Sequence, residues 1–380
     1  MKLAAAIRAE FTHAMDLRPR MQGRRTEHCV RLSDSGGRKR LLETALSRLL
    51  SLQYLRAFSA FGVVAFHAQG FTYGRTLVIG SAGVDVFFVV SGFVMWTVTA
   101  YRPQTPADFL LNRIVRIVPM YWFVTLSFVF AAILFPTLFP RLVLSASHTL
   151  ASLFFIPMRS PSNHEIWPVV VPGWTLNYEM FFYAIFALAL FLENPKRLLF
   201  VAAAFLALTL VGRIYTGNSP PMIFYTDPIM LEFPAGILLG RMFEQDRLPQ
   251  LRWGYISLAA GLLLFLVSAR LEIESPRVAV WGIPALLLVA GAVIIEKNRN
   301  IPLAPALAVL GDASYSIYLT HTLTISAIAK FKAYFTPASF FVASLVLSAL
   351  IGVSAWRLLE RPFAEFLKPR SSVQQPHLAE

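Results

Sequence analysis

A small set of ionisable side chains stands inside long apolar segments of this sequence. An ionisable group within a membrane span costs at least about 2.5 kcal/mol, so each one is a hypothesis for a functional site. The set comprises Arg56, His67, Asp85, Glu179, Glu232 and His321. These residue types bind anions and transfer protons, which predicts acid–base chemistry on a polar substrate.

Arg56 and His67 belong to one apolar segment, YLRAFSAFGVVAFH. Eleven residues at 100° each bring the two side chains to within about 20° of the same helix face, about 16 Å apart along the axis. That face carries a cation at one end and a titratable base further along. The alternatives are an arginine that extends to the membrane surface and a histidine that only bonds a neighbouring helix.

Two carboxylates are candidates to orient this histidine. Asp85 lies near the start of GVDVFFVVSGF, and Glu179 lies about five residues into a segment that begins GWTLNYEMFFY. Both fall near the expected depth of His67. A carboxylate bonded to the imidazole would fix its tautomer and raise its basicity, as a general base requires. The alternative is a helix-packing motif with a hydrogen-bonded aspartate.

Other residues are candidates for binding substrates. Arg113 and Arg116 are three apart, hence on one side of a helical turn, and paired guanidiniums suit a phosphorylated ligand. Trp174 and Tyr183 offer aromatic surfaces for stacking on a sugar, or form an interfacial belt. Ser314, Tyr318 and His321 follow at i, i+4 and i+7. This polar stripe predicts a helix face turned toward protein or a water-filled cavity. For the two arginines, the alternative is ordinary anchoring of membrane topology.

The elements that position these residues are long apolar segments. Of the 380 residues, 56% are hydrophobic and only 14% are charged, whereas a soluble domain carries about 25% charged residues. Segments of roughly 17–23 residues match a bilayer core about 30 Å thick. We therefore predict an all-α membrane helix bundle whose ten transmembrane helices lie near 52–72, 79–100, 117–139, 174–192, 198–214, 226–241, 254–270, 278–295, 310–330 and 338–358.

The placement of the basic residues predicts the topology. The net charge is +13, but Lys and Arg flank the apolar segments, which favours a membrane protein over a nucleic-acid-binding one. With the N-terminus inside, inner loops and ends contain fourteen Lys and Arg residues and outer loops contain eight. Because such residues are retained on the cytoplasmic side, both termini are expected in the cytoplasm. The longest outer loop is then residues 140–173.

Three regions are expected along the chain. Residues 1–50 form a basic tail, disordered or interfacial, with an amphipathic helix near its end; residues 51–363 form the membrane domain, and 364–380 a short cytoplasmic tail. Whether the tail of residues 1–50 belongs to the native protein stays open. Cys29 is the only cysteine, which excludes an internal disulfide and a cysteine-rich metal site. The sequence has no cluster of acidic residues that would predict a metal-binding site.

Six motifs in order resemble those of the acyltransferase 3 family of integral-membrane O-acyltransferases. They are Arg56–x10–His67, GVDVFFVVSGF, NRIVRIVPMYW, WTLNYEMFFY, LGDASYSIYLTH and Glu360-Arg361-Pro362. The leading LQYLRAFSAFGVVAFH is most similar to exopolysaccharide acetyltransferases. The resemblance covers residues 51 to 363.

The resemblance implies a bacterial-type inner-membrane enzyme that transfers an acyl group, acetyl above all, from cytoplasmic acyl-CoA to a hydroxyl of an exported or cell-surface polysaccharide. It implies that His67 is the catalytic histidine, that Arg56 is its motif partner, and that Arg113 and Arg116 meet the phosphates of CoA. No soluble esterase-like domain follows, so the membrane domain is expected to perform the transfer alone. Acyl-CoA is a donor substrate; no bound cofactor is implied.

Two other classes of function compete with this interpretation. A secondary transporter or flippase of a glycan or lipid-linked intermediate would line its path with the same polar residues, although no convincing pair of inverted hydropathy repeats is present. A membrane scaffold without catalysis explains poorly why Arg and His recur on single helix faces. The sequence does not show which glycan is the acceptor or whether the acyl group is acetyl or succinyl. It also leaves open whether His67 is a base or an acyl carrier, and what the oligomeric state is.

Overall fold

The computed structural model describes residues 49–72, 78–273 and 275–367. The chain divides into a unit of residues 1–42 and a compact unit of residues 43–380. The predictions for the basic N-terminal tail with its interfacial helix, for Cys29, and for residues 368–380 of the C-terminal tail lie outside the described residues.

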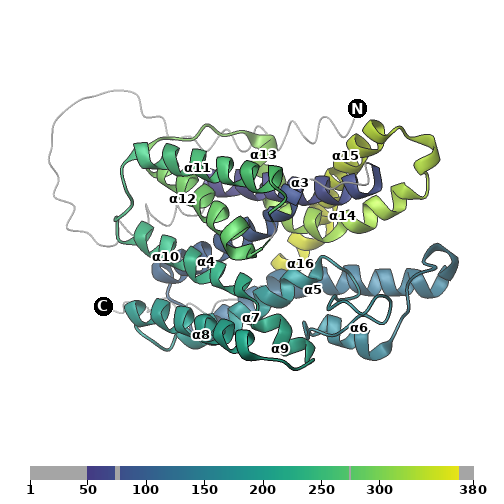
Figure 1. Ribbon diagram of the computed structural model, residues 1–380, viewed down its shortest axis with the longest axis horizontal. Coiled ribbons are helices and arrows are strands. Elements are labelled where there is room, and N and C mark those ends of the chain that lie inside the picture. Colours follow the sequence, from purple (N-terminus) through teal and green to yellow (C-terminus); the bar gives the residue numbers. More distant parts are fainter. Residues whose placement is uncertain (1–48, 73–77, 274, 368–380) are drawn as a thin grey trace, which may run out of the picture. The chain divides into compact units, whose positions relative to one another are not determined.

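Every regular element in the described ranges is helical (Figure 1). The α-helices are α3 (Leu50–Thr72), α4 (Gly83–Tyr101), α5 (Pro106–Leu134), α6 (Ala146–Leu153), α7 (Gly173–Ala189), α8 (Asn194–Ile214), α9 (Pro220–Tyr225), α10 (Glu232–Glu244), α11 (Leu251–Arg270), α12 (Ile283–Asn298), α13 (Pro305–Asp312), α14 (Ser314–Ala329), α15 (Pro337–Ala355) and α16 (Arg361–Phe366). The predicted all-α class is confirmed.

Seven helical segments in the described part of the chain are long and apolar enough to cross a membrane. They contain α4, α5, α8, α10, α11, α12 and α15. The other three predicted spans are also helical, as α3, α7 and the α13–α14 pair. The chain is thus a polytopic helix bundle. The count of ten crossings and the cytoplasmic placement of both termini stay predictions.

Three predicted boundaries are wrong. Helix α5 begins at Pro106, not near residue 117, because Thr105 caps it by accepting a hydrogen bond from the Asp108 amide at 3.1 Å. The predicted helix 226–241 begins only at Glu232, after a 3₁₀ turn at Pro228–Leu231. The predicted helix 310–330 is broken between α13 and α14, which meet at Ala313.

Glycines allow the closest helix contacts. Helix α4 packs most extensively on α10. There Gly92 lies against the backbone of Phe233, and Gly236 lies against the backbone of Val89, so that a Cβ atom at either glycine would overlap the facing helix. Helices α11 and α12 meet in the same way at Gly291, which lies against the backbone of Leu258 and Gly254. Small residues at such crossings are typical of membrane helices, where association depends on close packing.

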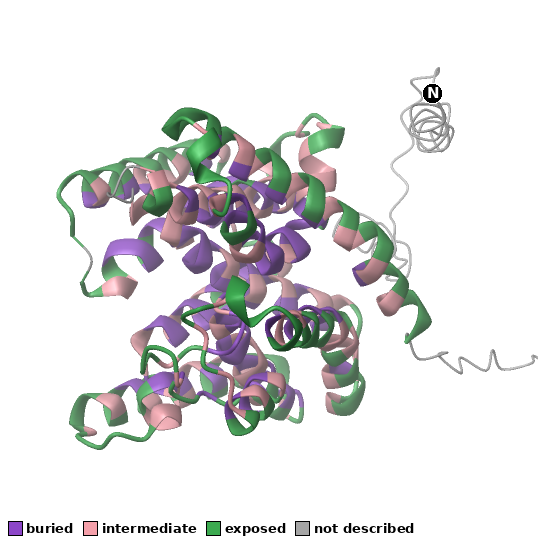
Figure 2. Cartoon of the chain, turned by 90° about the vertical axis from the view of Figure 1, so that its right-hand side faces the viewer, coloured by how far each residue is buried: buried purple, intermediate pink, exposed green. Residues whose placement is uncertain are grey.

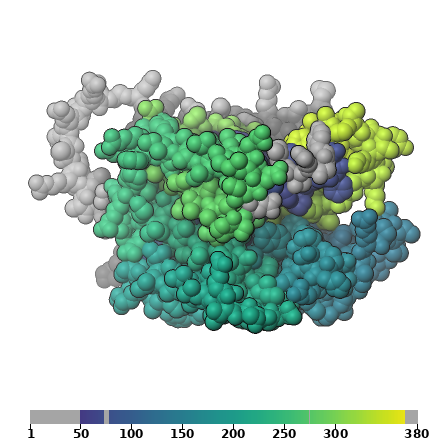
Figure 3. Space-filling view, in the orientation of Figure 1, coloured from purple at the N-terminus to yellow at the C-terminus, as the bar shows by residue number. Residues whose placement is uncertain are grey.

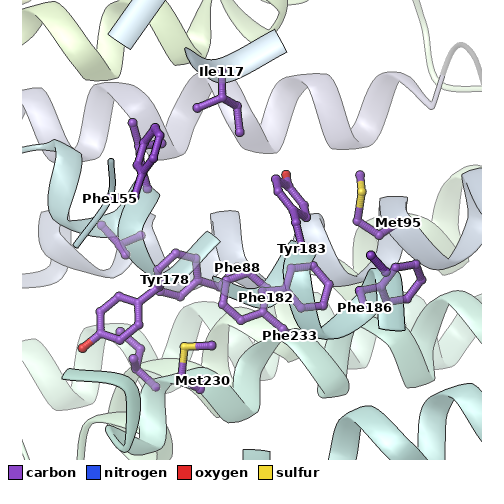
Figure 4. Close-up of a cluster of buried hydrophobic side chains, with 14 of the residues drawn as sticks. Phe88, Met95, Ile117, Phe155, Tyr178, Phe182, Tyr183, Phe186, Met230 and Phe233 are labelled. Carbon is purple, nitrogen blue, oxygen red and sulfur yellow. The ribbon is translucent and has the colours of Figure 1, made fainter. Parts of the chain in front are cut away.

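A stack of aromatic rings fills the bundle core beside α4. The ring of Phe233 lies 4.6 Å from Phe88 and 4.3 Å from Phe182, centroid to centroid, and both pairs are stacked (Figure 4). Buried residues lie inside the bundle and exposed ones outside it (Figure 2). The exposed side chains include many large apolar ones, as on α11, whose segment lies on the surface in Figure 3. An apolar exterior suits a helix bundle surrounded by lipid.

The start of α3 is held by a carboxylate from another helix. Glu296 on α12 accepts hydrogen bonds from the amides of Leu50 at 2.8 Å and Ser51 at 2.9 Å, and from the Ser51 hydroxyl at 2.5 Å. A negative group at a helix N-terminus satisfies amides that have no partner within the helix. This contact fixes the helix that carries both Arg56 and His67.

Candidate active site

A cavity of about 140 Å³ lies among α3, α4, α5, α7 and α14. Helix α4 contributes one face, from Val84 through Phe87, Phe88 and Ser91 to Met95. The predicted site residues that line it are Arg56, Arg113, Arg116, Glu179, Tyr183 and Tyr318. The fold therefore gathers six of the predicted residues, from four helices, around one cavity.

Three guanidinium groups contribute positive charge to this cavity. Arg113 and Arg116 lie one turn apart on α5, and Arg56 reaches the same space from α3. Arg113 is half-buried, with its guanidinium 5.9 Å from the centroid of the Phe109 ring, whereas Arg116 is exposed. The predicted pairing of the two α5 arginines on one side of a helix is confirmed by their common cavity.

Glu179 is the carboxylate that faces these cations. It accepts hydrogen bonds from the Ser91 hydroxyl of α4, at 2.8 Å, and from the Tyr183 hydroxyl of its own helix. One carboxylate against three guanidiniums leaves the cavity with an excess of positive charge. Such a lining attracts an anionic ligand.

Aromatic and hydroxyl groups of α4, α7 and α14 meet at one part of the cavity lining. Thr175 donates a hydrogen bond to the Tyr318 hydroxyl at 3.2 Å, and the Tyr318 ring lies 5.9 Å from Phe87. Tyr318 also lies 5.7 Å from the ring of His321. Tyr318 thus separates the cavity from a buried histidine.

His67 lies beside His321, with the ring centroids 5.0 Å apart. His67 is half-buried and His321 is fully buried. Neither ring lines the cavity, but His321 lies beside Tyr318, which does. Helices α3 and α14 pack against each other, so this pair joins two of the sequence motifs.

The expected carboxylate partners of His67 lie elsewhere. Asp85 is fully buried and accepts a hydrogen bond from Arg277 at 2.6 Å, and Glu179 is bonded to Ser91 and Tyr183. The prediction that one of them orients His67 is therefore wrong in this structure. Asp85 faces Arg277 and Glu232, whereas Val84 and Phe88 of the same helix line the cavity.

Arg277 is the charged partner of Asp85, and the sequence predicted it only as one of the basic residues of the outer loops. Burial lowers the pKa of its guanidinium, but the carboxylates of Asp85 and Glu232 outweigh that effect, and the net result is a raised pKa. Glu232, in the predicted sixth span, lies in this cluster and not in the cavity. Glu232 is likewise buried. The cluster connects α4 and α10 to the π-helical turn Val278–Gly282, which follows Arg277 directly.

Trp174 lies outside the cavity lining, whereas Ser91 belongs to it. Trp174 packs against Tyr178, with ring centroids 5.8 Å apart, and does not line the cavity. Ser91 is not among the candidates from the sequence, yet it lines the cavity and donates a hydrogen bond to Glu179. Its signal was its position seven residues after Val84, on the same face of α4.

The sequence of the chain matches a protein-family model. A model described as an acyltransferase domain matches residues 49–357, which include the cavity residues, both histidines and five of the six sequence motifs. The chain belongs to this acyltransferase family. As a polytopic helix bundle of that family, it is a membrane O-acyltransferase.

Relatives of this acyltransferase carry similar descriptions. It is 45% identical over 300 residues to exopolysaccharide production protein ExoZ of Rhizobium meliloti, covering 78% of this chain and 93% of that protein. It is 24% identical to O-acetyltransferase OatA of Staphylococcus aureus, over 85% of this chain but only 58% of OatA. Acyltransferase MdmB of Streptomyces mycarofaciens is 27% identical over 73% of this chain and 79% of MdmB. No solved structure matches the chain.

Proposed function

We propose that this acyltransferase transfers an acetyl group from cytoplasmic acyl-CoA to a hydroxyl of an exported or cell-surface polysaccharide. The relative named for exopolysaccharide production covers most of the chain at 45% identity, which supports a polysaccharide acceptor. The relative named as an O-acetyltransferase supports acetyl as the group transferred. The bacterial inner membrane is the expected location, since an exported glycan and a cytoplasmic donor meet there.

The observation that carries the proposal is the cationic cavity. Arg56, Arg113 and Arg116 line it, and a guanidinium binds phosphate through two parallel hydrogen bonds. From Met95 to Val84 the cavity follows eleven residues of α4, a length of about 16 Å. In the proposed complex, the phosphates of an extended acyl-CoA lie at the three guanidiniums and its thioester lies further along the cavity.

The reaction needs a base for the acceptor hydroxyl. In the proposed mechanism His67 takes the hydroxyl proton while the hydroxyl oxygen attacks the thioester carbonyl. A carbon–oxygen bond forms, the carbon–sulfur bond breaks, and the proton passes to the departing thiolate, which leaves as free CoA. The thioester end of the donor would lie near Tyr318, next to the histidine pair. The alternative role for His67 is a transient acyl carrier.

The proposed topology assigns each substrate to a side. With both termini in the cytoplasm, Arg113 and Arg116 lie toward the inner face, where acyl-CoA is made. The polysaccharide acceptor would approach from the outer side, near the loop of residues 140–173. Membrane lipid surrounds the exposed apolar helix faces. This arrangement transfers the acyl group across the membrane without moving the whole donor.

Transfer by the purified protein tests the proposal. The protein in proteoliposomes receives radiolabelled acetyl-CoA and deacetylated exopolysaccharide from a strain that lacks the gene. We expect label in the polysaccharide and release of free CoA in equal amounts. A protein that moves the glycan across the membrane but releases no CoA would instead be a transporter or flippase.

A further inference from the structure

His321 has a defined tautomer. Its Nδ1 atom lies 2.5 Å from the backbone carbonyl oxygen of Tyr318, one turn earlier on α14. A carbonyl oxygen only accepts hydrogen bonds, so Nδ1 carries the proton. In the neutral ring, Nε2 must then be the acceptor. The structure therefore fixes which nitrogen of His321 is available to a neighbour.

That acceptor is buried, and the ring that carries it lies beside another histidine. Among the described residues, Nε2 of His321 has no hydrogen-bond partner. An unsatisfied buried acceptor costs about 1–3 kcal/mol. The neighbouring ring on α3 is His67, 5.0 Å away between centroids and tilted by 44°. The terminal ring torsion of a histidine is soft, so a rotation of His67 can direct one of its N–H groups at Nε2.

The helix that carries His321 is firmly held. Ser316 donates a hydrogen bond to buried Glu360 at 2.5 Å, and Thr320 donates to the Ser316 carbonyl at 2.8 Å. Gly352 of α15 packs against the backbone of Ile317, with no room for a side chain at the glycine. His321 is therefore a fixed reference against which the half-buried His67 can be oriented.

We propose that His321 is a positioning residue that sets the tautomer of His67. The Tyr318 carbonyl accepts from His321, and His321 accepts from His67. The second nitrogen of His67 then keeps its lone pair for the acceptor hydroxyl. This inference rests on the proposed role of His67 as base. The transferred proton moves from hydroxyl to His67 and on to the thiolate, while His321 keeps its own proton throughout.

The relay, by which we mean the hydrogen bonds from His67 to His321 and from His321 to the Tyr318 carbonyl, replaces the carboxylate that the sequence predicted beside His67. A carboxylate beside His67 would place another charge inside the membrane, at a cost that a neutral imidazole avoids. The backbone carbonyl supplies the outermost acceptor without a titratable group. Asp85 and Glu179 are then free for the contacts that they make with Arg277 and with Ser91 and Tyr183.

A pair of substitutions at one position separates positioning from proton transfer and from packing. In H321Q, the amide nitrogen can donate to the Tyr318 carbonyl and the amide oxygen can accept from His67, but nothing titrates. In H321L, neither bond forms. We expect H321L to lower kcat by roughly 10²-fold with the KM for acetyl-CoA unchanged, and H321Q to stay within about tenfold of the parent. Equal inactivity of both variants, or a normal kcat in H321L, would overturn the proposal.

A spectroscopic measurement keeps the test independent of folding defects and of the reaction itself. Histidines labelled with nitrogen-15 report by their shifts which ring nitrogen of His67 is protonated, with H67Q identifying the signal. We expect a single tautomer in the parent protein and in H321Q. Two tautomers of His67 in the folded parent would refute the relay even if transfer occurs. A single tautomer in a protein that transfers no acetyl group would support the relay and refute only the proposed function.

Discussion

Arg116→Ala tests the donor end of the cavity. Arg116 is exposed at the cavity lining, so it can be removed without leaving a buried gap. A hydrogen bond to a charged group contributes about 1.5–3 kcal/mol, and exposure places this contact at the lower end of that range. Each 1.4 kcal/mol is about tenfold in affinity. We expect the KM for acetyl-CoA to rise about tenfold, with kcat nearly unchanged because the contact is remote from the reacting carbonyl.

The assay follows CoA release from proteoliposomes at increasing concentrations of acetyl-CoA. Arg102→Ala is the matched control, since Arg102, which follows α4, is also exposed but does not line the cavity. Arg116→Lys keeps the charge but loses the forked geometry, so its KM should fall between the parent and the alanine variant. An unchanged KM in Arg116→Ala, with normal insertion, would show that the arginine is only a topology anchor.

Two further predictions concern assembly and orientation. Glu296→Ala removes three hydrogen bonds at the start of α3, and we expect transfer to be lost at a lower temperature than in the parent; Glu193→Ala, in an exposed pair with Lys196, is the control and should change little. An unchanged inactivation temperature for Glu296→Ala would contradict the anchoring role. Reporter fusions after residue 370 should be cytoplasmic and those within 145–165 external, and a cytoplasmic signal from 145–165 would reverse the topology.

Local spacing predicted those features that one helix decides alone. The long apolar segments located the helices, because a bilayer fixes their minimum length. The three-residue spacing of Arg113 and Arg116 put both on one face, and the structure places both in the cavity. The seven-residue spacing of Ser314 and His321 predicted a face turned away from lipid, and both are buried.

Contacts between helices could not be predicted because depth along a helix does not fix its rotation. Asp85 and His67 were expected to meet at similar depth. Asp85 instead faces Arg277, 192 residues later in the chain. Nothing local in the sequence distinguishes these two partners. Gly311 likewise fits against the backbone of Gln53, on a helix far away in the sequence, and no local spacing predicts that contact.

His67 is the proposed base of an acyl transfer from acyl-CoA to a glycan. The most direct measurement is the rate of acetyl transfer by His67→Gln, in proteoliposomes with saturating acetyl-CoA and deacetylated polysaccharide. Glutamine keeps a hydrogen-bond donor and acceptor but cannot take the proton. Loss of a general base costs about 10²–10⁴-fold, whereas loss of one hydrogen bond between membrane helices costs about 0.6 kcal/mol. We predict normal insertion, normal binding of acetyl-CoA and at least a hundredfold loss of transfer. Transfer within about threefold of the parent would show that His67 only packs against His321.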